Sequence, residues 1–306
     1  MKKTVKEKSR FFPILLTVLA VLFVLFILLP ISLSLFDGSK IGNVAIIPID
    51  GPITGNGGSY LGQSTTSAKT VVNFIKEAEK DSQIKVILFE INSPGGSAVA
   101  SDEIASAIKK STKPTISVIR EVGASGGYWI ASATNHVIAN RMSITGSIGV
   151  ISSFLEFSGL MEEYGIGYEQ LTAGEYKDAG TPYRKLTGEE KIILQKKINR
   201  IHDYFIEEIA NNRNLEKSKI TELATGEFYL GIEALEFNLI DQLGNRDTAE
   251  QYIKDNYNLE EVDFVSYQTE LSFFGLLTGV FSEASFNIGK GLGSILLEKS
   301  NKLMLI

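Results

Sequence analysis

The sequence predicts an α/β protein with a mainly parallel sheet covered on both faces, preceded by one membrane-spanning segment. Two observations predict the sheet. Short apolar runs alternate with segments of helical spacing between residues 43 and 140, and the run at residues 85–92 (KVILFEIN) is typical of a buried central strand. A third observation predicts the membrane segment, because residues 11–36 carry no charge and roughly 20 apolar residues span a bilayer.

The N-terminal region has the pattern of an uncleaved anchor. Residues 1–10 hold five positive charges and one negative charge, and the uncharged stretch begins directly after Arg10. A cleaved signal peptide has an apolar core of only about 7–15 residues and a small-residue cleavage site. The stretch here is longer, and Ser32-Leu33-Ser34 matches such a site poorly. We therefore expect a cytoplasmic N-terminus and a chain that faces outward after about residue 37.

Composition excludes several classes of protein. The 306 residues have a net charge of −6 and include no cysteine. The acidic balance argues against nucleic-acid binding, and the lack of cysteine excludes disulfides and cysteine-built metal sites. We expect no cofactor and no metal.

The predicted elements follow from apolar pattern and turn residues. Apolar runs predict the strands, apolar residues on one side predict the helices, and Gly- and Ser-rich stretches predict the loops. In order, we expect a strand at 43–50, a loop at 51–67, a helix at 70–81, a strand at 85–92, a turn at 93–97, a helix at 98–110, a strand at 114–122, a helix at 125–134 and a strand at 136–140. This alternation predicts right-handed βαβ units.

Two further segments lie toward the C-terminus. Residues 187–213 predict one long amphipathic helix, which Thr187 and Glu190 can begin with a capping box. The tail at 271–306 contains an uncharged run of 12 residues, LSFFGLLTGVFS, which is too short to span a membrane. Surface binding, packing on a neighbour and partial disorder all remain open for it.

Ser125 is the candidate nucleophile. Residues 123–127 (GASGG) fit the pattern G-x-S-x-G, between a predicted strand and a predicted helix. In a nucleophile elbow, small neighbours permit the tight turn that exposes the serine oxygen. The N–H groups at the start of the helix then face the substrate. Small residues before a helix also occur for packing alone, so the motif needs a base beside it.

Three residues could be the base that takes the proton of Ser125. His136 begins a short strand and His202 lies within the long helix, so we interpret them as a strand-edge and a helix-surface histidine. The order Ser125, Asp178, His202 nevertheless leaves an α/β-hydrolase esterase open. The third residue, Lys177, could act only as a neutral amine, which needs burial near apolar groups or cations. Its neighbour Asp178 would oppose this if the two made contact.

Five motifs carry a resemblance to a known family over about residues 43–247. The chain resembles the short, membrane-anchored form of the signal peptide peptidase A family, serine proteases with a Ser-Lys dyad. The motifs are NSPGG at 92–96, GASGGYW at 123–129, TGSIGV at 145–150, EYKDAG at 175–180 and ATGEFYLGIEALEFNLIDQLGN at 224–245. One departure is Asn238, at a helix end where the family usually has glycine. Asparagine tolerates the left-handed conformation nearly as well.

The resemblance implies a fold and a set of site residues. The fold would be the ClpP/crotonase-like α/β fold of repeated β-β-α units. Ser125 would be the nucleophile, Lys177 the general base, and Ser147 the residue that orients the lysine amine. The oxyanion would receive the N–H of Gly126 and an N–H from the SPGG turn, from either Gly95 or Gly96.

The resemblance also implies an organisation and a function. We expect a basic N-terminus at 1–10, an anchor at 11–36, a protease domain at 43–250 and a C-terminal extension at 251–306. The enzyme would cut apolar peptides, above all remnant signal peptides, at the cell membrane. It would assemble into a ring or dome, in which Ser125 and Lys177 can come from neighbouring subunits. Alternatives are a protease with another membrane-protein substrate, the α/β-hydrolase esterase, and a crotonase-like acyl-CoA binder.

Overall fold

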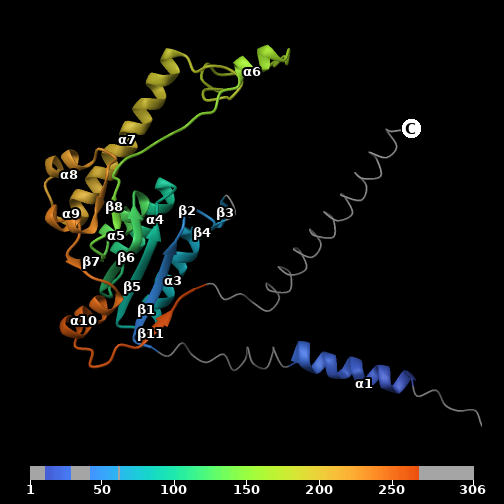
Figure 1. Ribbon diagram of the computed structural model, residues 1–306, viewed down its shortest axis with the longest axis vertical. Coiled ribbons are helices and arrows are strands. Elements are labelled where there is room, and N and C mark those ends of the chain that lie inside the picture. Colours follow the sequence, from blue (N-terminus) through green and yellow to red (C-terminus); the bar gives the residue numbers. More distant parts are fainter. Residues whose placement is uncertain (1–10, 29–41, 61–62, 269–306) are drawn as a thin grey trace, which may run out of the picture. The chain divides into compact units, whose positions relative to one another are not determined.

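The computed structural model describes residues 11–28, 42–60 and 63–268 (Figure 1). The chain divides into two compact units, one of residues 41–268 and one that combines residues 1–40 with residues 269–306. In the second unit, the described part is the uncharged helix α1 (Phe11–Phe23) and a π-helical turn, η1 (Val24–Leu28). Within the described residues, no helix is both long and apolar enough to cross a bilayer. The rest of the expected anchor and the tail at 271–306 lie outside the described residues.

A mainly parallel sheet forms the centre of the larger unit, as the sequence predicts. Its main path runs in the order β10-β7-β6-β5-β1-β11, with every pair on it parallel. These strands are β1 (Val44–Asp50), β5 (Val86–Ser93), β6 (Thr115–Ala124), β7 (His136–Ala139), β10 (Gln242–Leu243) and β11 (Phe264–Ser266). Because β11 pairs with β1, the sheet continues past residue 250, where the sequence suggested an extension would begin.

The sheet branches at the carboxyl end of β6. The first part of β6 pairs with β7, and its last residues pair with β8 (Ile144–Gly146). Strand β9 (Phe228–Leu230) then pairs antiparallel with β8. The sequence did not predict β8 or β9. The branch brings the Gly146–Ser147 turn next to the residue that follows β6, which is Ser125.

Helices cover both faces of the sheet. On one face, α3 (Ala68–Lys80), α4 (Ala98–Lys109) and α5 (Gly126–Ser132) bury their apolar sides in the main core. Ser67 and Ser97 begin the first two of these helices with side-chain caps. On the other face, α10 (Arg246–Tyr257) buries Ala249 and Ile253 in a smaller core with residues of β1, β5 and β6.

The loop expected at 51–67 contains short strands instead. These are β2 (Ile53–Thr54), β3 (Gly58–Tyr60) and β4 (Gln63–Ser67), in the order β2-β4-β3. Threonines hold this small sheet together, because the hydroxyl of Thr54 bonds that of Thr65 at 3.3 Å and the hydroxyl of Thr66 donates to the Asp50 carbonyl at 2.7 Å. Ile53 also bridges to Gly96 and so fixes the SPGG turn.

The long helix α7 (Gly188–Arg213) is found where the sequence predicts it, with the Thr187–Glu190 capping box formed. Its second half buries Phe205, Ile206 and Ile209 against the core, whereas its first half is mostly exposed. The preceding segment, residues 151–187, carries the short helix α6 (Ser158–Glu163). In Figure 1, α6 and the start of α7 lie well away from the sheet. We call residues 151–187 the arm.

Two short helices and an ion pair complete the larger unit. They are α8 (Lys217–Leu223) and α9 (Gly231–Glu236).

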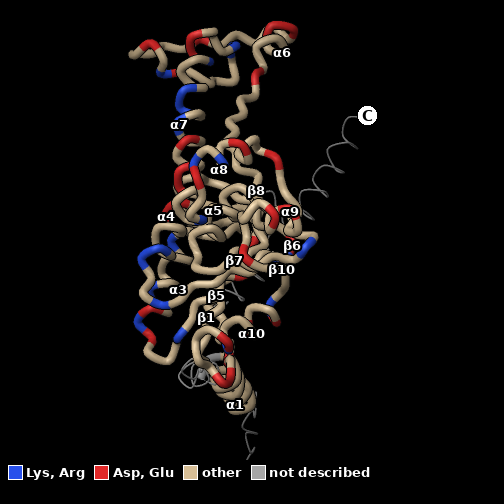
Figure 2. The backbone as a smooth tube through the Cα atoms, turned by 90° about the vertical axis from the view of Figure 1, so that its left-hand side faces the viewer, with Lys and Arg blue, Asp and Glu red and all other residues tan. Residues whose placement is uncertain are grey.

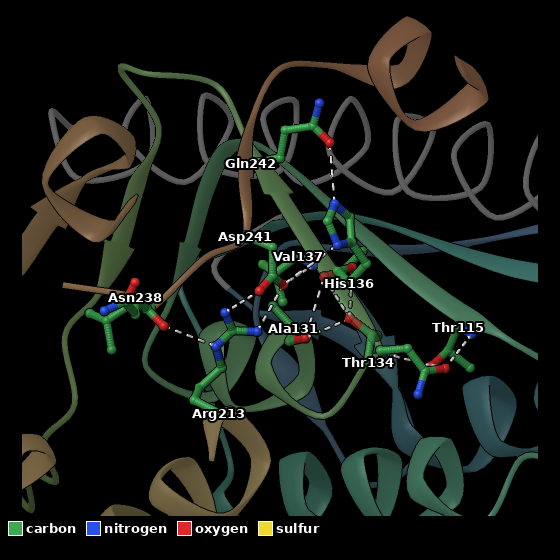
Figure 3. A network of polar contacts seen from close by, with 12 residues as sticks. Thr115, Ala131, Thr134, His136, Val137, Arg213, Asn238, Asp241 and Gln242 are labelled. Carbon is green, nitrogen blue, oxygen red and sulfur yellow. Dashed lines mark hydrogen bonds and ion pairs between the residues drawn. The ribbon is translucent and has the colours of Figure 1, made fainter. Parts of the chain in front are cut away.

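At the end of α7, Arg213 donates two bonds to Asp241, at 2.9 and 2.7 Å, and a third to the Asn238 carbonyl at 3.2 Å (Figure 3). Asp241 also accepts from the Val137 N–H at 2.7 Å. The pair therefore joins α7 to β7 and to the segment before β10. Asn238 has a φ of 62°, as expected for a left-handed residue.

Loss of Arg213 should destabilise the domain strongly. The Arg213 side chain is 7% exposed, so Arg213→Ala leaves the half-buried Asp241 carboxylate without its charged donor, at a cost of about 1.5–3 kcal/mol. Urea denaturation measures this free energy of unfolding. The control is Lys217→Ala, whose pair with Glu207 is exposed on both sides and should contribute about 0.2–1 kcal/mol. Equal losses in the two variants would contradict the prediction.

The same pair predicts a pH dependence of stability. Burial raises the pKa of Asp241, but the hydrogen bonds and charge of Arg213 outweigh burial and hold this pKa below its ordinary value. A carboxyl group with a lowered pKa stabilises the folded state above its unfolded pKa of about 3.9. That contribution is lost as pH falls through the lowered pKa. In Arg213→Ala, the free energy of unfolding should therefore fall less than in the wild type as the pH drops through this range.

Candidate active site

Ser125 occupies a strained turn between β6 and α5. Its φ is 51° and its ψ is −121°, a conformation that costs a non-glycine residue of the order of 1–3 kcal/mol. Two backbone bonds hold the turn, from the Ser125 N–H to the Gly146 carbonyl at 2.8 Å and from the Trp129 N–H to the Ser125 carbonyl at 2.9 Å. The geometry is that of a nucleophile elbow.

Two unpaired N–H groups lie beside Ser125. The N–H of Gly126, at the first position of α5, and the N–H of Gly96 have no hydrogen-bond partner among the described residues. The two glycines are in close contact, since a Cβ added to Gly126 would lie 3.3 Å from the Gly96 nitrogen and 2.3 Å from Ser101 Oγ. Two adjacent free donors beside a serine can bind a developing oxyanion.

Gly95 has a different place in the turn. Its N–H donates to Ser93 Oγ at 3.1 Å, and Ser93 Oγ in turn donates to the Gly51 carbonyl at 2.6 Å. Its φ of 96° is one that L side chains rarely adopt. Of the two glycines that the sequence left undecided, Gly96 is therefore the one whose N–H is free.

Ser125 lies between an apolar hollow and a polar hollow. The apolar hollow has a volume of about 400 Å³ and the polar hollow one of about 430 Å³. Both are bordered by Ser125, Gly149, Val150, Ile151 and Ile198. The apolar hollow adds Ala98, Trp129, Ile201 and Phe205, and the polar hollow adds Ser147, Gln195, Asn199, His202 and Thr225. We name each hollow by the side chains that it alone has; hydroxyl and main-chain groups of residues such as Gly96, Ser97 and Gly149 also border the apolar hollow, so its lining is mixed.

Ser147 borders the polar hollow. It has a φ of 48°, and its N–H donates to the Glu227 carbonyl at 2.9 Å. Its hydroxyl donates to the Gly226 carbonyl at 3.3 Å. The serine is therefore fixed in the same hollow as Ser125, where it could hydrogen-bond an entering amine.

Lys177 lies apart from Ser125 within one chain. It is exposed on the arm, in a turn where its N–H donates to the Gly174 carbonyl at 3.2 Å, and it borders neither hollow. The structure thus brings Ser125, Ser147, Gly96 and Gly126 together and leaves the expected base outside.

Asp178 is engaged by an arginine, not by a histidine. Arg184 Nε and Nη2 each donate to the Asp178 carboxylate at 2.8 Å, and the guanidinium also bonds Glu190. The hydrogen bonds from Arg184 lower the pKa of Asp178 and bring that of Glu190 to about 2. The order Ser125, Asp178, His202 is therefore not assembled as a triad, and the Asp178 charge is already matched by Arg184.

The two histidines differ in position. His136 is stacked on Tyr252 with ring centroids 3.8 Å apart. Its Nε2 lies 3.2 Å from Gln242 Oε1 (Figure 3), and it borders neither hollow. His202 is half-buried, its Nε2 lies 3.2 Å from the Ile148 carbonyl, and it borders the polar hollow. The prediction of a helix-surface histidine did not include this position beside the site.

Sequence reasoning missed the helix face that completes both hollows. Ile198, His202 and Phe205 are spaced by four and three residues on α7, which places them on one face of the helix. This spacing was the available signal. Among the described residues, no group of three or more His, Asp or Glu side chains could hold a metal ion.

Comparison with known proteins gives consistent matches. The model of Peptidase family S49 matches residues 107–260. A Methanocaldococcus jannaschii protein that carries the name of a protease is 33% identical over 90% of this chain and 91% of its own length. An Enterococcus faecium protein that carries the name signal peptide peptidase SppA is 31% identical over 79% of this chain and 71% of its own. The chloroplastic serine protease SPPA of Arabidopsis thaliana is 30% identical over 70% of this chain and 31% of its own.

Proposed function

The chain belongs to peptidase family S49 and is a serine peptidase, and from this premise we propose that it is a membrane-anchored endopeptidase with a Ser-Lys dyad. Its substrates would be apolar peptides, in particular signal peptides left after their release from exported proteins. Ser125 is the nucleophile, Lys177 the general base, and Ser147 the residue that orients the lysine amine. Gly96 and Gly126 bind the oxyanion.

The proposed reaction proceeds through an acyl-enzyme. The neutral Lys177 amine takes the Ser125 hydroxyl proton while Oγ attacks the peptide carbonyl carbon. The resulting oxyanion accepts the two free N–H groups, which are each worth roughly 3–4 kcal/mol in such sites. The protonated lysine then gives its proton to the leaving amine as the C–N bond breaks. Water, deprotonated by the same amine, hydrolyses the ester and releases the second product.

One observation carries the assignment of Ser125. The residue is held at positive φ with two unpaired N–H groups beside it. The strained turn and the unpaired donors both lower the stability of the fold. Acyl transfer requires an exposed nucleophile and donors for the oxyanion, and this turn supplies both. The side chains of Trp129, Ile201 and Phe205, which border the hollow next to Ser125, support an apolar substrate side chain.

The arm supports a base supplied by a neighbouring subunit. Many of its large apolar residues are exposed, including Ile151 at 91% and Leu171 at 98%, and exposed apolar surface of this extent marks an interaction site. We infer that the arm packs on a second copy of the chain and brings Lys177 into that copy's polar hollow. Repetition of this head-to-tail contact would close a ring.

The remaining parts of the proposal concern location and fold. Helix α1 carries no charged residue (Figure 2), which supports an anchor at residues 11–36 with the basic N-terminus in the cytoplasm. The catalytic unit would then lie outside the cell membrane. The parallel sheet with helices on both faces supports assignment to the ClpP/crotonase-like fold.

Labelling with a fluorophosphonate tests both the nucleophile and the location. A membrane-impermeant probe added to intact protoplasts should label the wild-type chain and should not label Ser125→Ala. Ser132→Ala, which changes a buried serine on the same helix, is the matched control and should be labelled. Labelling that persists in Ser125→Ala would remove this residue from the mechanism. Wild-type labelling that appears only after lysis would refute the orientation.

A further inference from the structure

Lys177 lies on a compact turn of the arm. Its N–H donates to the Gly174 carbonyl at 3.2 Å, and the Thr181 N–H donates to the Asp178 carbonyl at 2.9 Å. Gly174 has a φ of 103°, which L side chains rarely adopt. We call residues 174–181 the lysine turn. These backbone bonds are local, so they do not by themselves attach the turn to the rest of the protein.

Arg184 joins the lysine turn to the start of α7. Its Nε and Nη2 donate to the two carboxylate oxygens of Asp178, both at 2.8 Å. Its Nη1 and Nη2 donate to the two carboxylate oxygens of Glu190, at 2.9 and 2.5 Å. One planar guanidinium therefore binds two carboxylates, each through two bonds. A lysine in its place could not reproduce this geometry.

Glu190 is a fixed end for this link. It is the third residue of α7 and only 3% exposed, which is rare for a glutamate without a partner. Besides its bonds from Arg184, its Oε2 accepts from the Thr187 N–H at 2.8 Å in the capping box. The link from Asp178 through Arg184 therefore ends on the first turn of a helix of 26 residues.

A second bond attaches the other side of Lys177 to the same helical turn. The Tyr176 hydroxyl donates to Glu189 Oε1 at 2.7 Å. The residue before Lys177 is thus bonded to α7 directly, and the residue after it is bonded to α7 through Arg184. Attachments on both sides of Lys177 restrict its backbone and so the direction in which its side chain leaves the turn.

Helix α7 connects the lysine turn to the body of the protein. Its second half is buried in the core at Phe205, which also borders the apolar hollow. An α-helix rises about 1.5 Å per residue, so roughly 22 Å separates Glu190 from Phe205 along the axis. The lysine turn is therefore held at the far end of a helix that is anchored beside the active site, a position suited to reaching a second subunit.

We propose that Arg184 is a positioning residue for the catalytic base. By binding Asp178 and Glu190 together, it fixes the lysine turn to α7 and so places the Lys177 amine at the Ser125 that it serves. Arg184 borders neither hollow, so it acts through Lys177 and not on the substrate. This inference rests on the proposed function, because it takes Lys177 as the base.

The kinetics of Arg184→Ala separate positioning of the base from substrate binding. We expect kcat on an apolar peptide to fall by about 10- to 100-fold, the scale of a misplacement of about 1 Å. KM should stay near its wild-type value, because the hollows beside Ser125 are unchanged. Tyr168→Phe is the matched control. It removes a bond to Gln170 on the same arm, keeps the ring beside Tyr183 and should leave kcat unchanged. A wild-type kcat in Arg184→Ala would overturn the inference.

Added guanidinium tests whether the missing group itself is responsible. The Arg184 side chain is 37% exposed, so a small cation can reach the space that it leaves in Arg184→Ala. Millimolar guanidinium chloride should raise kcat of this variant several-fold, whereas sodium chloride at the same ionic strength should not. Guanidinium should leave Lys177→Ala inactive, because that variant has no amine to position. Equal responses of the two variants to guanidinium would contradict a role through Lys177.

Asp178→Asn makes the test independent of how well Arg184→Ala folds. It keeps the size of the side chain, removes the charge that Arg184 binds, and should also lower kcat without changing KM. In the double variant Arg184→Ala/Asp178→Asn, the loss should be smaller than the product of the two single losses, because both substitutions break one link. Losses that multiply would overturn the inference. An active Lys177→Ala would overturn the proposed function as well, whereas an inactive Lys177→Ala beside fully active Arg184→Ala and Asp178→Asn would overturn this inference alone.

Discussion

Lys177→Arg should abolish peptide hydrolysis although it conserves the charge. A general base must be neutral, and the guanidinium of arginine stays protonated in proteins. We expect kcat/KM on an apolar peptide to fall by about 10²–10⁴-fold, the usual contribution of general acid–base catalysis. Lys177→Ala should lose as much. Because Lys177 is exposed, both variants should stay within about 0.5 kcal/mol of the wild-type free energy of unfolding.

Matched variants separate the dyad from its rivals. Lys185→Arg changes another exposed lysine of the arm and should leave kcat/KM unchanged. His136→Ala and His202→Ala should retain most activity. His136 borders neither hollow, and the His202 ring contacts the Ile148 carbonyl through Nε2. Ser147→Ala should lose activity only in part, because its hydroxyl orients the amine. An active arginine variant, or a folded but inactive His202→Ala, would mean that the base is not Lys177.

The features that the sequence predicts correctly are those that depend on residues near each other in the chain. The buried strands are visible in sequence because a parallel strand covered on both faces must be apolar, as in residues 86–91. The turn at Ser125 is visible because its tight geometry restricts the neighbouring residues to small ones. The helix at 188–213 and the left-handed Asn238 also follow from local rules of capping and backbone conformation.

The parts that could not be predicted depend on distant partners. Strand β11 pairs with β1 across some 220 residues of sequence, between Val44 and Phe264, and no local pattern encodes that pairing. The small sheet at 53–67 is rich in Gly, Ser and Thr, so its composition indicates a loop. His202 and Trp129 border the hollows beside Ser125 because α7 packs on α5, where Phe205 stacks on Trp129. The surroundings of Lys177 depend, in our proposal, on a second subunit.

Two inactive variants should restore activity to each other. If Ser125 of one subunit pairs with Lys177 of its neighbour, a mixed assembly of Ser125→Ala and Lys177→Ala subunits contains sites in which both residues are wild type. With random mixing in equal amounts around a head-to-tail ring, about one quarter of the sites meet this condition. Co-expression of the two chains should therefore recover about a quarter of wild-type activity, whereas each variant alone has essentially none.

A second mixture distinguishes a dyad formed between subunits from one formed within a single chain. Wild-type chains mixed equally with the double variant Ser125→Ala/Lys177→Ala also have about one quarter of intact sites if the dyad forms between subunits, but about one half if it forms within one chain. Activity per assembly, with mixing verified by two affinity tags, distinguishes these values. Verified mixed assemblies of the two single variants that stay inactive would show that the arm folds back to bring Lys177 to its own Ser125. The exposed apolar residues of the arm, such as Leu171 and Ile151, favour the first outcome, because burial between subunits would remove from water the surface that a single chain leaves uncovered.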